Sequence, residues 1–181
     1  MIASGESRKE ATGRSEVLSA FKAKTRIGFR NVRTMYGTGK LAQVTTEMRR
    51  YNLHILGVSE SRWTGSGKIK TNTGEPVLYS GRDDNHHSEG VAIIHKKGTE
   101  KGLIEWKPVS SRLITAQLKG EHTNMTLIQC YAPTTNSGEA IKDTFYEQLQ
   151  ADLLVVVGDL NAKVGNNANV GNNNTDIDRV L

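Results

Sequence analysis

The sequence is poor in cysteine and has no long hydrophobic run. Cys130 is the only cysteine among 181 residues, which excludes a disulfide framework and a zinc site built on cysteines. One cysteine favours a reducing compartment, so we expect an intracellular protein, nuclear or cytoplasmic. The N-terminus lacks the apolar stretch of a signal peptide, and its acidic residues argue against a transit peptide. The longest apolar runs have the length of strands, so no membrane partner is expected.

Positive charge is in modest excess and is concentrated at the N-terminus. The formal net charge is +5, of which residues 1–26 contribute +3, from six Lys/Arg and three Glu. A basic tail can add sequence-independent attraction to phosphate. Residues 1–24 are rich in Ser, Lys, Glu and Gly, and we predict a disordered tail there. Residues 167–181 form a second, Asn/Gly-rich tail.

Between these tails, hydrophobic periodicity predicts an α/β domain over 25–166. Apolar spacing predicts amphipathic helices over 39–51 and 138–150, the second with Ile141, Phe145 and Leu149 on one face. Apolar runs bounded by polar turns predict the strands, at 26–32, 53–58, 77–79, 90–95, 112–118, 125–131 and 153–157. Helices that alternate with buried strands indicate at least one mixed sheet.

Polar side chains follow several of these strands where each strand leaves the core. These are Asn31, Glu60, Tyr131, Asp159 and Asn161. Ligands of α/β sheets tend to bind beyond the carboxyl ends of the strands, so we expect these side chains to meet there. Each taken alone has a simpler interpretation, because Asp and Asn after a strand are common turn and cap residues.

Together, the five residues fit metal-assisted phosphoester hydrolysis. Glu60 offers a hard oxygen ligand of the kind that suits Mg²⁺ or Mn²⁺. Asp159 can orient and deprotonate a water molecule. Asn31 and Asn161 can donate to phosphate oxygens or hold Asp159, and Tyr131 can donate to charge that develops in the transition state.

Five short motifs, in this order, resemble the endonuclease/exonuclease/phosphatase superfamily. They are Asn31-Val32-Arg33-Thr34-Met35, Gly57-Val58-Ser59-Glu60, Gly90-Val91-Ala92-Ile93, Cys130-Tyr131-Ala132-Pro133-Thr134 and Gly158-Asp159-Leu160-Asn161. A narrower resemblance is to the apurinic-endonuclease-like domain of non-LTR retrotransposons and to craniofacial development protein 2-like chains. It rests on Ser61-Arg62-Trp63-Thr64-Gly65 and Ala162-Lys163-Val164-Gly165.

This resemblance implies a two-sheet α/β sandwich with flanking helices, the DNase I-like fold. It makes Glu60 the metal ligand, Asp159 the activator of water, Asn161 its phosphate-contacting partner, and Tyr131 and Asn31 donors that line the site. DNA would be the partner and a nick the product, as in retrotransposon endonucleases; no obligate protein partner is indicated.

The chain also departs from the family. The Ser-Asp-His motif that completes such sites is absent, so the resemblance implies an incomplete sheet with an exposed edge and impaired activity. There are two further departures. The connection at Gln150-Ala151-Asp152 is short, and Arg30 stands where relatives carry Trp. The alternatives are a non-catalytic remnant that binds nucleic acid weakly and a phosphatase branch of the superfamily.

Other suggestive residues are given simpler interpretations. Gly65-Ser66-Gly67-Lys68 lacks the spacing of a P-loop. The acidic, His-rich segment 83–89 is predicted to be a solvated loop. Trp63 and Trp106 could stack on bases, but we expect them to pack against loops. Arg112 opens a strand from which it could reach the site.

Overall fold

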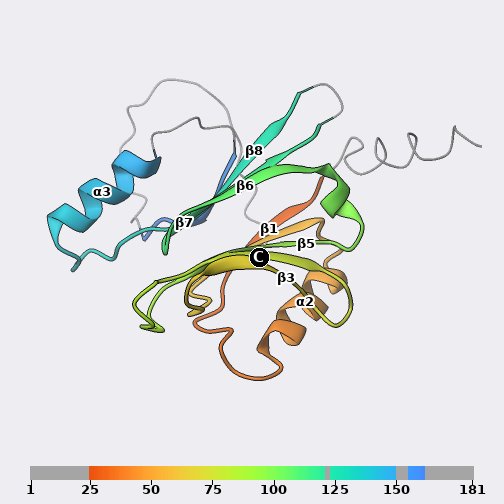
Figure 1. Cartoon of the computed structure of the whole chain (residues 1–181), viewed down its shortest axis with the longest axis horizontal. Helices are drawn as coiled ribbons and strands as arrows, with labels where there is room; N and C mark the ends of the chain where they lie inside the picture. Colours follow the sequence, from red (N-terminus) through yellow and green to blue (C-terminus); the bar gives the residue numbers. More distant parts are fainter. Residues whose placement is uncertain (1–24, 121–122, 150–154, 162–181) are drawn as a thin grey trace, which may run out of the picture.

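Two β-sheets packed face to face form the body of the molecule (Figure 1). The computed structural model describes residues 25–120, 123–149 and 155–161. In the five-stranded sheet the order is β1-β2-β5-β4-β3, and in the four-stranded sheet it is β6-β7-β8-β9. This confirms the predicted two-sheet sandwich. The tails, residues 1–24 and 167–181, and the short connection at 150–152 lie outside the described residues.

The five-stranded sheet is built around two strands whose residues are all buried. Its strands are β1 (Ile27–Asn31), β2 (Ile55–Ser59), β3 (Ser66–Lys70), β4 (Pro76–Ser80) and β5 (Val91–His95). Every residue of β2 and β5 is buried, because one face of the sheet packs against the second sheet and the other against a helix. β1 runs parallel to β2 and the remaining pairs are antiparallel.

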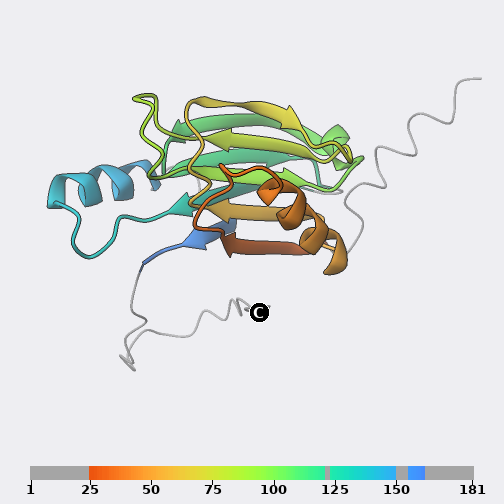
Figure 2. The ribbon, with the colours of Figure 1, turned by 90° about the horizontal axis from the view of Figure 1, so that it is seen from below.

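The helix that covers the outer face is α2 (Lys40–Arg50), which Figure 2 shows lying across the sheet. Its Val44 and Met48 are buried in a core cluster with Leu56, Val58 and Ile94. Their spacing of four residues places both on one face of the helix, as the periodicity predicted. Arg49 and Arg50 in the last turn complement the helix dipole.

The four-stranded sheet comprises β6 (Leu103–Ser110), β7 (Leu113–Leu118), β8 (Met125–Tyr131) and β9 (Val155–Asp159). A 3₁₀ turn, η1 (Thr99–Gly102), leads into β6. β8 and β9 are parallel, and β9 forms an edge of the sheet in the described part of the chain. The predicted start of this last strand, Leu153 and Leu154, lies outside the described residues.

Helix α3 (Glu139–Leu149) packs on the outer face of the four-stranded sheet through fewer residues than predicted. Phe145 is buried against Ile128 and Cys130, and Leu149 packs at the rim of that cluster. Ile141, predicted on the same face, is 51% exposed. Burial along this face is therefore confined to the later turns of α3.

Two strands have no counterpart among the predicted elements, and both lie at sheet edges. β3 contains Lys68 and Lys70 and is almost wholly exposed, whereas β6 contains Pro108 at an irregularity in its pairing with β7. Lys and Pro are tolerated on edge strands because one side makes no ladder hydrogen bonds. An edge strand therefore needs no apolar alternation, which is the pattern on which the prediction depended.

Candidate active site

Four parallel strand ends deliver the predicted site residues to one end of the sandwich. Asn31 ends β1, and Glu60 directly follows β2, its parallel neighbour. Tyr131 ends β8 and is paired in register with Asp159, which ends β9. β1 and β2 both contact β9 across the two sheets. The predicted meeting of these side chains beyond the strand ends is what the structure shows.

The amide of Asn31 joins the two carboxylates. Its Nδ2 donates to Glu60 Oε1 at 2.7 Å and to Asp159 Oδ2 at 3.0 Å. Its Oδ1 accepts the backbone N–H of Arg33 at 3.0 Å in a local turn, and this bond directs Nδ2 toward the acids. Asn31 and Asp159 are 128 positions apart in sequence. Because the Asn31 amide is neutral, it offsets none of the charge of the two carboxylates that it contacts.

Asp159 is held on its other side by a tight turn. The backbone N–H of Asn161 donates to Asp159 Oδ1 at 3.1 Å, and the Asn161 side-chain Nδ2 donates to the carbonyl of Ala132 at 2.6 Å. Asn161 has φ 46°, a left-handed conformation that Asn tolerates better than most residues. The Asx turn that was the simpler interpretation of Asp159-Leu160-Asn161 is therefore present, and it orients the carboxylate.

Gly158 brings the backbone of β9 close to β8. A Cβ atom at this position would lie 2.1 Å from the carbonyl oxygen of Cys130, so no other residue fits without a backbone shift. The Ala132 N–H donates to the Asp159 carbonyl at 2.8 Å. Asp159 is consequently positioned by main-chain packing on β8 as well as by its side-chain hydrogen bonds.

Glu60 has an unusual backbone conformation. It has φ 57°, in the left-handed region that costs an ordinary residue about 1–2 kcal/mol. Arg62, two residues on, has the same φ, and its guanidinium nitrogen Nη2 lies 4.0 Å from Glu60 Oε2. Such a strained conformation persists only where the surrounding contacts hold it in place, and residues of this kind are concentrated at functional sites.

Tyr131 is supported by Arg112, which the sequence had only suggested. The Arg112 guanidinium stacks over the Tyr131 ring, 5.1 Å from its centroid, and donates to the carbonyls of Tyr131 and Ala132 at 3.3 and 3.4 Å. Burial, followed by the charge of Glu60 and a hydrogen bond to it, raises the pKa of the Tyr131 phenol. Tyr131 therefore stays protonated near neutral pH and can act as a donor.

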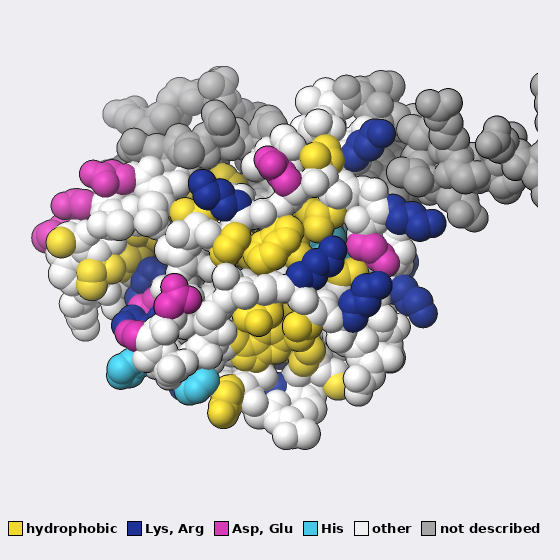
Figure 3. Space-filling model, in the orientation of Figure 1, with side chains coloured by type: hydrophobic (Ala, Val, Ile, Leu, Met, Phe, Trp, Pro, Cys, Tyr) yellow, Lys and Arg dark blue, Asp and Glu magenta, His cyan; other side chains and the backbone are white. Residues whose placement is uncertain are grey.

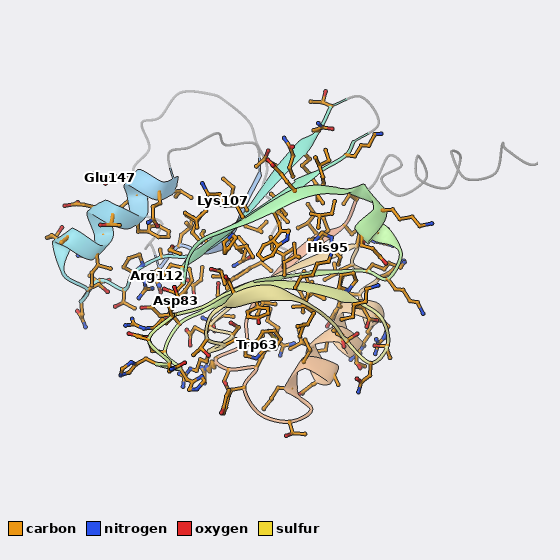
Figure 4. All side chains as sticks on the ribbon, in the orientation of Figure 1. Trp63, Asp83, His95, Lys107, Arg112 and Glu147 are labelled. Carbon is orange, nitrogen blue, oxygen red and sulfur yellow. The ribbon has the colours of Figure 1, made fainter. Side chains whose placement is uncertain are left out.

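Glu89 completes this support and was missed by the sequence reasoning. It accepts from Arg112 Nη2 at 2.8 Å and also from the hydroxyl of Ser111. The Arg112 side chain is only 17% exposed, so the pair is largely shielded from water. Figure 4 shows Arg112 at the same end of the sandwich as Asp83, at the start of the loop that carries Glu89. The only feature of the sequence that could have indicated Glu89 is its position directly before Gly90 and the buried strand that follows.

The residues that could hold a cation are few. Across residues 25–120, 123–149 and 155–161, no three or more His, Cys, Asp or Glu side chains form a cluster suited to a metal. In the loop 83–89, Asp84 pairs with Arg82 and His86 instead, as expected of a solvated loop. Glu60 and Asp159 therefore remain the oxygen donors at the strand ends.

Craniofacial development protein 2 of Bos taurus is 37% identical over 169 residues, which cover 89% of this chain and 28% of the relative. The protein of the same name from Tragulus javanicus is 36% identical, with 89% and 29% covered. The chain is a homologue of craniofacial development protein 2. It spans less than a third of the length of these curated relatives, and no family model matches it.

The fold is shared with a catalytic domain of known structure. The Xenopus laevis APE2 catalytic domain superposes with a TM-score of 0.52 at 15% identity, covering 75% of this chain and 58% of that domain. The chain therefore has the endonuclease/exonuclease/phosphatase-like, DNase I-like fold that its motifs implied. In the part of the chain that the structure describes, no helix is both long and apolar enough to cross a bilayer.

Proposed function

We propose that the residues at the strand ends carry out Mg²⁺-dependent hydrolysis of a phosphodiester bond, with DNA as the substrate and a nick as the product. The observation that supports this most is the contact of one Asn31 nitrogen with both Glu60 and Asp159. Two carboxylates placed side by side repel each other, so their convergence favours a role that uses both. DNA as the substrate follows from the resemblance to retrotransposon endonucleases.

The donor set suits a divalent cation of the Mg²⁺ type. Mg²⁺ is commonly held by one or two carboxylates, with waters and substrate phosphate as the remaining ligands. Glu60, with its carboxylate directed by the Asn31 amide, is the proposed ligand. When bound, the cation would neutralise charge on the phosphate; Mn²⁺ has similar ligand preferences.

The protein side chains supply the remaining functions. Asp159, held by Asn31 and by the Asn161 N–H, is positioned to accept a proton from an attacking water molecule. Asn161 holds this carboxylate in place through its backbone N–H, and we assign its side-chain amide to contact the substrate phosphate. Tyr131, protonated because its pKa is raised, donates a hydrogen bond to charge that develops on the phosphate oxygens.

A nicking assay on the full chain tests this proposal. Supercoiled plasmid, an abasic duplex and a phosphoinositide are each incubated with Mg²⁺, Mn²⁺ or EDTA. We expect metal-dependent nicking that falls by about 10²–10³ or more in Asp159→Asn and in Glu60→Gln. The matched control is Asp143→Asn, an exposed acid on α3, which should nick like the unmodified chain. Nicking that persists in Asp159→Asn would contradict the proposed role.

The second candidate is nucleic-acid binding without hydrolysis. It is favoured by the absence of a cluster of three metal-binding side chains among the described residues. In that case DNA would be retained without nicking, with an affinity that falls steeply with salt and on removal of the basic residues 1–24. Phosphate release from the phosphoinositide without nicking would instead indicate the phosphatase branch.

A further inference from the structure

An aromatic hollow lies beside the candidate site and has no part in the mechanism above. It has a volume of about 310 Å³ and is lined by Tyr36, Trp63, Thr64, Ile69, Tyr79 and His87. A volume of this order is in the range of small-ligand pockets. These six residues together form the aromatic hollow.

The hollow opens on the face of the five-stranded sheet that carries α2. Trp63 and Tyr79 pack at the margin of the core cluster that contains Val44 and Met48 of that helix. Figure 4 shows Trp63 on this side of β3, and Figure 3 shows hydrophobic side chains gathered in the same region of the surface. Because α2 does not cover this part of the sheet, the aromatic side chains stay accessible.

Defined contacts hold the rings in place. Trp63 Nε1 donates to the carbonyl of Met35 at 3.2 Å, and its ring meets Tyr79 edge-on with centroids 5.1 Å apart. His87 Nδ1 lies 2.8 Å from the carbonyl of Arg62, and the Tyr36 and His87 rings contact each other with centroids 4.3 Å apart. Tyr36 is nevertheless 66% exposed. An exposed ring held in one orientation is a surface on which a flat ligand can stack.

Two of the segments that line the hollow also carry residues of the candidate site. One loop runs from Asn31 to Tyr36 and the other from Glu60 to Trp63. Backbone hydrogen bonds join them, from Val32 N to Ser59 O at 3.1 Å and from Met35 N to Ser61 O at 2.8 Å. Part of the lining of the hollow therefore lies a few residues along the chain from Asn31 and from Glu60.

A cation lies between the hollow and the acids. Arg62 directs its guanidinium toward Glu60 at 4.0 Å, while its carbonyl holds His87. Arg33, whose N–H is bonded to Asn31, is also exposed on the adjoining loop. Arginine binds phosphate oxygens readily. The phosphate of a nucleic-acid strand could therefore contact Arg62 or Arg33 while an aromatic base stacks in the hollow.

We propose that the aromatic hollow binds an unpaired nucleobase of the nucleic-acid strand, while Arg62 contacts the phosphate that links this base to the candidate site. The inference rests on the proposed function, because it takes the strand to be the substrate. Stacking on aromatic side chains is tolerant of base identity, so the hollow would place the strand without selecting one base. Trp63 would then do more than pack against its loop.

Fluorescence offers a direct test, because the sequence has only two tryptophans. In a Trp106→Phe background of the full chain, Trp63 is the sole tryptophan. Single-stranded oligothymidylate, a base-free deoxyribose-phosphate oligomer of equal length, and thymidine monophosphate are titrated in EDTA, so that no strand is cut. We expect saturable quenching by oligothymidylate, much weaker binding of the mononucleotide, and no quenching by the base-free oligomer.

Two tyrosine variants make the test specific. Tyr36→Ala should weaken oligothymidylate binding about tenfold, the effect of losing one stacking contact, and leave binding of the base-free oligomer unchanged. The matched control is Tyr146→Ala, a 50% exposed tyrosine on α3, which should bind like the parent. Thermal melts of both variants check the fold, and none is expected to change greatly because both rings are exposed.

The outcome is independent of the nicking assay. Equal quenching by the base-free oligomer, or equal affinities of the Tyr36 and Tyr146 variants, would overturn the inference even if the chain nicks DNA. Quenching with the expected Tyr36 dependence would support the inference even if no hydrolysis is found, and the proposed function alone would then fail.

Discussion

Protonation of one buried histidine should set the acid stability of the domain. His95, at the end of β5, is fully buried, and neither ring nitrogen has a hydrogen-bond partner in the structure. Burial, together with the charge of Lys68, lowers the pKa of His95 from 6.5 to about 4, although Glu100 opposes the shift. The folded protein therefore keeps this imidazole neutral at pH values where an unfolded chain would protonate it.

The free energy involved follows from the pKa change. One pKa unit corresponds to about 1.4 kcal/mol, so a shift from 6.5 to about 4 amounts to about 3 kcal/mol. Because the folded pKa is the lower one, this stability is fully present above pH 6.5. It decreases as the pH falls from 6.5 to about 4, where the folded state also takes up the proton.

Urea unfolding measured between pH 7.5 and pH 4.5 tests this expectation. His95→Leu should be at least as stable as the unmodified chain at pH 7.5, because it buries no unpaired nitrogen, and should lose less stability on acidification. His86→Leu, at an exposed histidine, should retain the full loss because His95 is still present. Burial raises the pKa of Glu75, but bonds from Thr71, Thr73 and Arg49 lower it to about 2, so this carboxyl titrates below the range measured.

One result of these unfolding measurements would contradict the proposed effect of His95 on acid stability. If the stability difference between the unmodified chain and His95→Leu stays constant across the whole pH range, then His95 is either accessible to water or paired in the folded protein. A constant difference would remove the electrostatic argument but leave the packing of β5 unaffected.

Three further predictions concern the support of the candidate site. Tyr131→Phe should lower any nicking rate about 10²-fold with an unchanged melting temperature. Because the Tyr131 pKa is raised, its contribution should not decline as the pH rises through the mildly alkaline range; an unchanged rate would exclude it as a donor. Gly158→Ala should destabilise the fold by about 2 kcal/mol or more, since its Cβ would meet the Cys130 carbonyl, and an unchanged melting temperature would contradict the close approach. Arg112→Ala should cost about 1.5–3 kcal/mol in urea unfolding, because Glu89 loses its closest cation and keeps only Ser111 and the more distant Arg82; Glu89→Gln in the same background should recover part of that loss.

The local elements with buried residues could be predicted from the sequence. β2, β5 and the helix α2 were found because full or periodic burial leaves an apolar pattern along a few consecutive residues. The polar residues at the strand ends were found in the same way, since each interrupts such a pattern. Edge strands such as β3 left no pattern, because their residues face water.

The sequence by itself determined which side chains leave the core at strand ends and that the chain carries the motifs of a nuclease-like fold. Only the tertiary structure decided that Glu60 and Asp159 share the Asn31 amide, and that Arg112 with Glu89 supports Tyr131. The physical reason is the range of the interactions. Hydrophobic periodicity is a property of neighbouring residues, whereas the distance between two carboxylates far apart in the chain depends on how two whole sheets pack.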